Sequence, residues 1–249
     1  MAKSDRLPPI AILAGGRATR LGPLTATIPK SMIEVAGEPF IAHQLRLLVK
    51  QGIKEIVLCC GYMGDQIETF VGDGAAYGCR IRYSWDSEKL LGTGGALRRA
   101  LPLLGECFLV MYGDSYLTTR FQSVYEAFLR AGRPALMTVF RNEGRWDTSN
   151  IEFLGGKICR YDKVNRTSMM HYIDYGLSVL EAGAIADWRA NDVFDLADVF
   201  RELVKKRALA GYEVCERFFE IGSPNGLAET SAFLAGDKSR GASAHRLTP

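Results

Sequence analysis

The stretch that decides the fold lies near the N-terminus and consists of Pro9-Ile10-Ala11-Ile12-Leu13-Ala14-Gly15-Gly16-Arg17-Ala18-Thr19-Arg20-Leu21-Gly22-Pro23-Leu24-Thr25, continuing to Pro29-Lys30. Its first part is a short apolar run, which predicts a buried parallel strand over residues 8–14. The strand ends at two glycines, where the missing Cβ lets a ligand approach the backbone. Backbone N–H groups in such a turn form an electropositive concavity suited to phosphate. Arg17, Arg20 and Lys30 add positive charge, so this turn is predicted to bind a polyphosphate.

A glycine pair alone is also common in ordinary strand–turn connections, so the wider pattern matters. The turn is not a P-loop, because the spacing Gly-x-x-x-x-Gly-Lys-Ser/Thr is absent. It is not a dinucleotide-binding turn of the Gly-x-Gly-x-x-Gly type either, which argues against a nicotinamide-dependent oxidoreductase.

The chain has 249 residues, of which 47% are hydrophobic and 24% are charged. This length and composition predict a single α/β domain over residues 1–237, followed by a polar tail at 238–249 that we expect to be disordered. The net charge of +3 is too small to indicate a nucleic-acid partner but suits an anionic small substrate.

Targeting signals are absent from the sequence pattern. No apolar stretch approaches the roughly 20 residues that span a bilayer, and residues 1–9 lack the plan of a signal peptide. We therefore expect a cytoplasmic protein with no membrane partner. The six cysteines are scattered without Cys-x-x-Cys spacing and the three histidines have no metal-site spacing, so we expect reduced, mostly buried cysteines and no zinc.

Strands and helices alternate along the first part of the chain. This alternation predicts a Rossmann-like α/β fold with a mixed, mostly parallel sheet flanked by helices. From Arg141 the pattern changes to short strands separated by turns, and residues 150–154 and 157–161 predict a β-hairpin laid over the main sheet, across the turn Gly155-Gly156. The helices expected are at residues 39–52, 63–71, 92–104, 121–131 and 195–206.

Two further features belong to the predicted ligand side of the sheet. Gly92-Thr93-Gly94-Gly95 opens a helix, and Asp114 ends the apolar strand that begins at Cys107. Ligands of open α/β sheets gather at the carboxyl ends of the strands. A carboxylate there, close to polyphosphate, suits Mg²⁺, although an aspartate at a strand end can also simply cap the following turn.

The N-terminal pattern Gly-Gly-x-x-Thr-Arg-Leu-x-Pro-Leu-Thr-x-x-x-Pro-Lys resembles the signature of the sugar-phosphate nucleotidylyltransferases. The departure is Ala18, where the family usually has glycine. The resemblance extends from Ile10 to about Ala235. It implies transfer of a nucleoside monophosphate from an NTP to a sugar 1-phosphate with release of pyrophosphate, and it implies Mg²⁺ as the cofactor.

The resemblance also implies roles for individual residues. The catalytic residues would be Arg20, Lys30 and Lys163. The nucleotide would contact Leu13, Ala14, Gly15, Gly16, Arg17, Ser87, Glu88, Gly92, Thr93 and Gly113. The sugar phosphate would contact Asp162, Lys163, Asp174 and Gly176, with the β-hairpin over the sugar. Asp114 and Glu220 would hold the metal.

The base and the sugar are less well defined. Members that use uracil or thymine commonly have a glutamine five residues before the loop glycine, but Ser87 stands there, flanked by Asp86 and Glu88. A carboxylate can accept hydrogen bonds from guanine N1 and N2. The wording Leu-Gly-Thr-Gly-Gly-Ala-Leu also resembles heptose 1-phosphate guanylyltransferases, which favours GTP with a heptose or mannose-type 1-phosphate.

Other functions stay open from sequence alone. The enzyme could be a uridylyl- or thymidylyltransferase for a hexose 1-phosphate. A catalytically silent regulatory homologue is a further alternative, against which the presence of Arg20, Lys30 and Asp114 argues. A homo-oligomer is possible.

Overall fold

The computed structural model describes residues 6–16, 21–22, 25–86, 89–189 and 192–244, with side chains up to residue 236. A nine-stranded sheet runs through it in the order β5-β4-β1-β6-β11-β8-β12-β10-β9. Its strands are β1 (Ile10–Leu13), β4 (Glu55–Cys60), β5 (Arg80–Trp85), β6 (Cys107–Tyr112), β8 (Ala135–Arg141), β9 (Ile151–Leu154), β10 (Lys157–Tyr161), β11 (Tyr172–Glu181) and β12 (Leu209–Val214).

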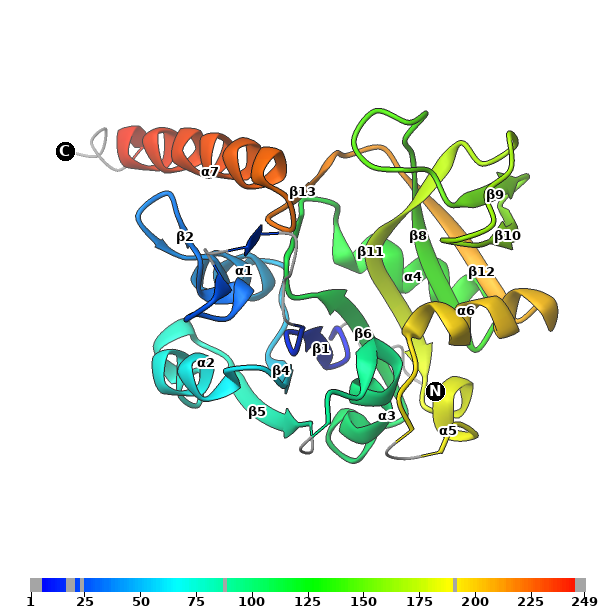
Figure 1. Ribbon diagram of the computed structural model, residues 1–249, viewed down its shortest axis with the longest axis horizontal. Coiled ribbons are helices and arrows are strands. Elements are labelled where there is room, and N and C mark those ends of the chain that lie inside the picture. Colours follow the sequence, from blue (N-terminus) through cyan, green and yellow to red (C-terminus); the bar gives the residue numbers. More distant parts are fainter. Residues whose placement is uncertain (1–5, 17–20, 23–24, 87–88, 190–191, 245–249) are drawn as a thin grey trace.

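Helices cover both faces of this sheet (Figure 1). One face packs against α1 (Phe40–Lys50), α2 (Gly64–Val71) and α4 (Phe121–Ala131). The other face packs against α3 (Gly92–Leu104), α5 (Gly183–Ala186) and α6 (Leu196–Lys205). Short elements complete the fold: the 3₁₀ turns η2 (Lys30–Met32) and η3 (Ala75–Tyr77), the pair β2 (Glu34–Val35) and β3 (Glu38–Pro39), and the pair β7 (Ser115–Leu117) and β13 (Phe218–Glu220), with α7 (Pro224–Ala244) last.

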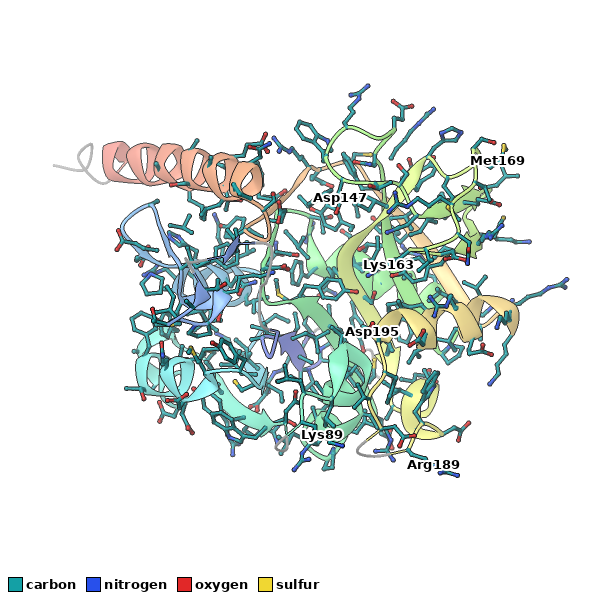
Figure 2. The ribbon with its side chains drawn as sticks, viewed as in Figure 1. Lys89, Asp147, Lys163, Met169, Arg189 and Asp195 are labelled. Atoms are coloured by element: carbon teal, nitrogen blue, oxygen red, sulfur yellow. The ribbon has the colours of Figure 1, made fainter. Side chains whose placement is uncertain are left out.

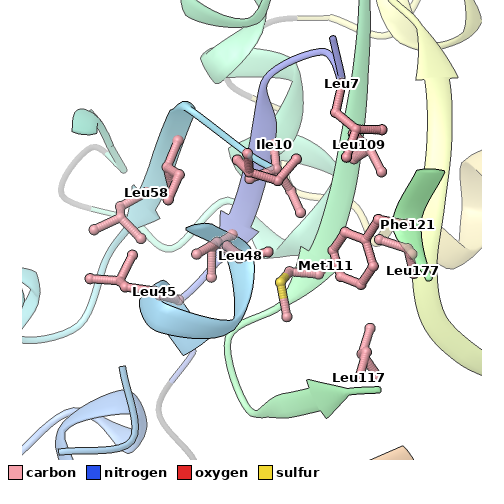
Figure 3. Close-up of a cluster of buried hydrophobic side chains, with 14 of the residues drawn as sticks. Leu7, Ile10, Leu45, Leu48, Leu58, Leu109, Met111, Leu117, Phe121 and Leu177 are labelled. Atoms are coloured by element: carbon pink, nitrogen blue, oxygen red, sulfur yellow. The ribbon is translucent and has the colours of Figure 1, made fainter. Parts of the chain in front are cut away.

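The apolar run of β1 explains why this strand is central. Ile10 and Ile12 point to the face that carries α1, while Ala11 and Leu13 point to the face that carries α3. Every residue of β1 is buried, as expected for a parallel strand covered on both faces. Figure 3 shows Ile10 among leucines of α1, β4 and β6, with Phe121 of α4 beside them.

The order of the strands creates a ligand-binding crevice. β5, β4, β1 and β6 are parallel neighbours, and the chain passes from β1 to β4 and β5 before it crosses back to β6 on the other side of β1. In open α/β sheets such a reversal leaves a crevice at the carboxyl ends of the two strands. β11 then runs antiparallel to β6 and β8, and β12 is parallel to β8. The expected mixed α/β sheet is confirmed. Its parallel run lies in the N-terminal half, whereas most pairings beyond β6 are antiparallel, so the sheet is less parallel than we expected.

The predicted hairpin exists as β9 and β10, but its placement differs from the expectation. It does not lie over the sheet: β10 pairs with β12 and β9 pairs with β11, each through one register pair. The strands β11, β8, β12, β10 and β9 therefore close on one another at the edge of the sheet. We also had no prediction for β12, whose apolar alternation is interrupted at Gly211, where an added Cβ would lie 2.5 Å from the Phe153 ring.

The last helix, α7, was not among the helices that we predicted. It continues through residues 238–244, which belong to the segment that we expected to be a disordered tail. The helix extends away from the body of the molecule (Figure 1). Leu234 anchors it, because this side chain is only 3% exposed and packs in a cluster with Val35, Phe40 and Ile221.

Candidate functional site

A cavity of about 320 Å³ opens at the carboxyl ends of β1 and β6. Nine of the residues predicted from the sequence line it together: Leu13, Ala14, Gly15, Gly16, Lys30, Gly92, Thr93, Gly113 and Asp114. We call it the first cavity. Arg17, Arg20, Ser87 and Glu88, which we also assigned to this site, lie outside the described residues. The position of the cavity is that of the crevice created by the strand order.

Close backbone packing explains two glycines of this cavity. An added Cβ at Gly113 would lie 2.8 Å from the carbonyl oxygen of Leu13, and one at Gly15 would lie 3.1 Å from the Gly61 nitrogen. The Gly113 N–H donates to that same Leu13 oxygen at 3.0 Å. Glycine at these positions therefore lets the ends of β1, β4 and β6 converge beneath the cavity.

The second glycine cluster, Gly92-Thr93-Gly94-Gly95, packs closely against another segment of the chain. In the structure, a Cβ at Gly94 would meet the Phe194 ring at 2.4 Å, and one at Gly95 would meet the Asp192 oxygen at 2.5 Å. The cluster is thus packed against residues 192–195. The Thr93 hydroxyl joins the two segments by donating to Asp195 Oδ1 at 3.2 Å and accepting from the Leu196 N–H at 2.9 Å.

A second cavity, of about 660 Å³, lies beside the first. Tyr112 and Asp114 line both cavities. Of the residues predicted for the sugar phosphate and the metal, Lys163, Asp174, Gly176 and Glu220 line the second cavity. Two of the residues that line the second cavity, Lys163 and Asp147, are labelled in Figure 2. The two cavities meet at the end of β6.

An ion pair occupies this meeting point. Lys30 Nζ lies 2.9 Å from Asp114 Oδ2, and the two side chains are 19% and 24% exposed. The other carboxylate oxygen, Oδ1, accepts a hydrogen bond from the Ser115 hydroxyl at 3.3 Å. Lys30 and Asp114 are 84 positions apart in the sequence, and the fold brings their charged groups into contact.

Glu220 reaches the same place through the pairing of β13 with β7. Glu220 is opposite Ser115 in this ladder, and the Ile221 N–H donates to the Asp114 carbonyl oxygen at 2.9 Å. The Glu220 carboxylate accepts hydrogen bonds from the Gly222 N–H and, at 2.6 Å, from the Ser223 hydroxyl. Among the described residues, no group of three or more His, Cys, Asp or Glu side chains could hold a metal ion. Asp114 and Glu220 nevertheless both line the second cavity. Two carboxylates suit Mg²⁺, which takes one or two carboxylates and completes its shell with phosphate and water.

Asp174 is engaged by protein donors. Its Oδ1 accepts from the Gly176 N–H at 3.0 Å, and its Oδ2 accepts from the hydroxyls of Tyr112 at 3.3 Å and Tyr161 at 3.4 Å. Burial raises the pKa of Asp174, while the nearby Lys163 charge and these hydrogen bonds oppose the increase. Gly176 has a φ of 100°, a conformation that favours glycine, at an irregularity in the β11 ladder.

Asp162, which we assigned to the sugar phosphate, is not among the residues that line either cavity. Its Oδ1 accepts from the N–H groups of Val164 at 2.9 Å and Asn165 at 2.8 Å. These backbone hydrogen bonds lower the pKa of its carboxyl group. The shorter side chain of aspartate folds back on the turn after β10, so Asp162 shapes the turn that carries Lys163.

Several lining residues were not among our site predictions. Tyr112, Asp86 and Asp195 line the first cavity, and Arg145, Trp146 and Asn150 are among those that line the second. Asp86 accepts from the Leu91 N–H at 3.2 Å, and burial raises the pKa of its carboxyl group. The sequence pointed indirectly to Asp86, because this residue precedes Ser87, the position where we expected the residue that recognises the base. Tyr112 precedes Gly113-Asp114 but belongs to no motif.

Comparison with known proteins identifies the family. The model of the family described as nucleotidyl transferase matches residues 10–149. The chain belongs to this family. The resemblance to the sugar-phosphate nucleotidylyltransferases seen in the sequence is thereby confirmed, and with it the assignment of the chain as an enzyme of this type.

Two named relatives align with most of the chain. An N-acetylmuramate alpha-1-phosphate uridylyltransferase of Neisseria meningitidis is 32% identical, over 90% of this chain and 97% of its own length. A D-glycero-alpha-D-manno-heptose 1-phosphate guanylyltransferase of Campylobacter jejuni is 28% identical, over 86% of this chain and 94% of its own length.

The fold is shared with solved structures. A putative glucose-1-phosphate thymidylyltransferase of Bacillus anthracis superposes with a TM-score of 0.82, covering 91% of this chain and 95% of that one at 20% identity. Within the part of the chain that the structure describes, no helix is long and apolar enough to cross a membrane.

Proposed function

We propose that this enzyme transfers a nucleoside monophosphate from an NTP to a sugar 1-phosphate. An oxygen of the sugar phosphate attacks the α-phosphorus, the bond from that phosphorus to the bridging oxygen breaks, and pyrophosphate leaves. The observation that carries the proposal is the meeting of two cavities at Tyr112 and Asp114. Two substrates bound on either side would present their phosphates to each other at this point.

The chemistry requires positioning and charge neutralisation. A phosphate monoester has a second pKa near 6, so the attacking oxygen is largely ionised at neutral pH and needs no protein base. The obstacle is the repulsion between two anions. Fixed cations at the junction lower this barrier, because preorganised charge in a site that excludes water stabilises the charge of the transition state.

Lys30 and Lys163 supply cations from opposite sides of the junction. Lys30 lines the first cavity and is suited to the α-phosphate, while Lys163 lines the second and is suited to the sugar phosphate. Arg20, with Arg17, is proposed to neutralise the departing pyrophosphate. The loop glycines, with Leu13 and Ala14, would surround the nucleotide, and Gly176 would leave room for the sugar.

Asp114 and Glu220 would hold Mg²⁺. When bound, the ion would neutralise phosphate charge on the nucleotide. Lys30 would then exchange its contact with Asp114 for one with phosphate. The hydrogen bonds from Gly222 and Ser223 fix the Glu220 carboxylate at the start of α7. The Ile221 N–H, which donates to the Asp114 carbonyl oxygen, holds the backbone of this segment beside Asp114.

For the base we propose guanine, read by an acid on the segment that follows β5. Asp86 lines the first cavity, and Ser87 and Glu88 follow it in the sequence. A carboxylate accepts from guanine N1 and N2, donors that uracil does not present in that arrangement. A heptose or mannose-type 1-phosphate is the matching acceptor, as in the Campylobacter relative. A uridylyltransferase is the second candidate, favoured by the Neisseria relative.

A substrate matrix tests both candidates. ATP, CTP, GTP, UTP and dTTP are each combined with glucose, mannose, N-acetylmuramate and heptose 1-phosphates in the presence of Mg²⁺, and pyrophosphate release is measured. We expect release with GTP and a manno-configured acceptor. Release with UTP alone would contradict the guanine assignment, and the absence of release with every pair would favour a catalytically silent homologue.

A further inference from the structure

Two tyrosines share one carboxylate beneath the wall between the cavities. Tyr112 ends β6, Tyr161 ends β10, and Asp174 lies in β11. Both phenolic hydroxyls donate to the same oxygen of Asp174, at 3.3 Å and 3.4 Å. Three strands are thus joined at one atom, and β6 is distant in the sequence from β10 and β11. The arrangement fixes the position of both rings, because each ring is held at its hydroxyl as well as at its backbone.

The two rings lie next to the ammonium group of Lys163. Its Nζ is 5.6 Å from the centroid of the Tyr112 ring and 5.9 Å from that of Tyr161. A cation within about 6 Å of an aromatic ring is attracted to the negative face of the ring. Lys163 itself stands on an exposed turn, and the long, flexible stem of lysine costs conformational entropy to fix. The contact with the two rings restricts the Lys163 side chain before substrate binds, so less conformational entropy is lost on binding.

We propose that Tyr112 and Tyr161 are positioning residues for the acceptor phosphate: their rings seat the Lys163 ammonium at the junction of the two cavities, and Asp174 locks both rings. The inference rests on the proposed function where it assigns Lys163 to the sugar phosphate. It gives Asp174 a role through the tyrosines, because both phenolic hydroxyls donate to its Oδ2 while the Gly176 N–H donates to its Oδ1.

Tyr161 is the most informative position, because it lines neither cavity and is 3% exposed. A change in substrate affinity on its replacement would have to act through another group. The variants are Tyr161→Leu, which removes the ring, and Tyr161→Phe, which keeps the ring and removes the hydroxyl. Tyr112→Leu and Tyr112→Phe form the parallel pair. Tyr172→Leu is the matched control, since Tyr172 lies on β11 and packs against Phe153 outside both cavities.

The first measurement is steady-state kinetics with the substrate pair found active. We expect Tyr161→Leu to raise the KM for the sugar 1-phosphate about tenfold, with less than about a twofold change in the KM for the NTP, as loss of a cation–π contact predicts. Tyr161→Phe loses the hydrogen bond to Asp174 but keeps the ring, so it should raise the acceptor KM only about two- to threefold. An equal rise in both KM values, or a rise as large in the Phe variant or the Tyr172 control, would overturn the proposal.

The second measurement does not depend on catalysis. Isothermal titration with inorganic phosphate is carried out on the wild-type protein, on Lys163→Ala and on each tyrosine variant. The Lys163-dependent binding should weaken about tenfold in Tyr161→Leu and Tyr112→Leu and persist in the Phe variants, which are expected to fold. If the wild-type protein releases no pyrophosphate with any substrate pair, the proposed function fails, while this titration still decides the role of the tyrosines. Unchanged phosphate binding in both Leu variants would refute it.

Discussion

At the scale of single residues, the contact between Lys30 and Asp114 gives the junction its character. The pair is half-buried, where Coulomb interactions are screened less than at an open surface. It places a cation and a carboxylate where the two cavities meet. In the absence of ligands, Lys30 and Asp114 neutralise each other. Lys30 is positioned to bind a phosphate, and Asp114 is positioned to bind a metal ion.

Replacing Asp114 with alanine should lower kcat by on the order of a hundredfold or more, as the loss of a group that stabilises the transition state typically does. Pyrophosphate release under saturating substrate is the measurement. Ser115→Ala is the matched control, because it removes only the hydroxyl that donates to Asp114 at 3.3 Å. A rate close to that of the wild type in Asp114→Ala would refute the role.

Replacing Lys30 with methionine should strengthen the binding of Mn²⁺ to the free enzyme by roughly five- to tenfold, because Asp114 loses the partner that neutralises it. The same variant should lose activity. Electron paramagnetic resonance of free Mn²⁺ measures the affinity without nucleotide, and Arg46→Met, which breaks an ion pair with Glu38 away from the cavities, is the control. Weaker Mn²⁺ binding in Lys30→Met would contradict this account.

Asp86 should contribute to the choice of base. Replacing it with asparagine keeps its shape and an acceptor for the Leu91 N–H, but removes the charge that suits the guanine donors. We expect the ratio of kcat/KM for GTP to that for UTP to fall about tenfold, within the range of a paired contact to a base edge. An unchanged ratio would contradict a role of Asp86 in the choice of base and would indicate that the neighbouring segment selects it.

Residue-level prediction succeeded where chemistry leaves a pattern in the sequence. Gly15, Gly113 and Asp114 were predictable as cavity residues because they follow apolar strands, and ligands of open α/β sheets gather at the carboxyl ends of the strands. Tyr112 was not predictable, since a tyrosine that ends an apolar strand is usually part of the core. The contacts of Asp162 with the turn after β10 were not predictable, because they depend on local backbone geometry that the family pattern does not specify.

At the scale of elements, the loop before α3 is held by packing against the segment before α6. Replacing Gly95 with alanine would place a Cβ 2.5 Å from the Asp192 oxygen, a backbone atom that cannot easily move. We expect the free energy of unfolding to fall by about 1–3 kcal/mol, as overpacking typically causes, and the KM for the NTP to rise. Chemical denaturation and steady-state kinetics are the measurements.

Gly183→Ala is the matched control for this change, since nothing lies within 4 Å of its added Cβ. It should leave stability within about 0.5 kcal/mol of the wild type, as substitutions away from special features usually do. Equal effects of the two substitutions would show that the contact with residues 192–195 does not hold the loop.

Most elements could be predicted, because the period of their apolar residues is clear. β12 could not, since its glycine serves the close approach of Phe153 and leaves no alternation to detect. β7 is three residues long, too short for a pattern, and its importance comes from pairing with β13. The placement of the hairpin at the edge of the sheet depends on long-range pairing with β11 and β12, which local sequence does not encode.

At the scale of the whole molecule, the C-terminal part of the chain completes the site formed by the N-terminal half. β13 brings Glu220 beside Asp114, and α7 fixes β13 from behind, with the Thr230 hydroxyl donating to the Glu220 carbonyl oxygen at 2.8 Å. The stability of α7 on the body is therefore expected to affect activity.

Replacing Leu234 with alanine should lower the free energy of unfolding by about 2–5 kcal/mol, as expected for a buried leucine. Leu129→Ala is the matched control, because Leu129 is 45% exposed on α4. Thermal unfolding and pyrophosphate release are measured together. A Leu234 variant as stable and active as the control would show that α7 does not support the site.

The central claim is that the crevice between the ends of β1 and β6 binds the triphosphate, with its metal ion held by Asp114 and Glu220. The most direct test is a crystal structure with a non-hydrolysable GTP analogue and Mn²⁺, whose anomalous scattering locates the ion. The account predicts phosphates against Leu13–Gly16 and Lys30, with the Mn²⁺ peak within coordination distance of both carboxylates. A triphosphate bound outside the first cavity, or an ion that neither Asp114 nor Glu220 contacts, would contradict it.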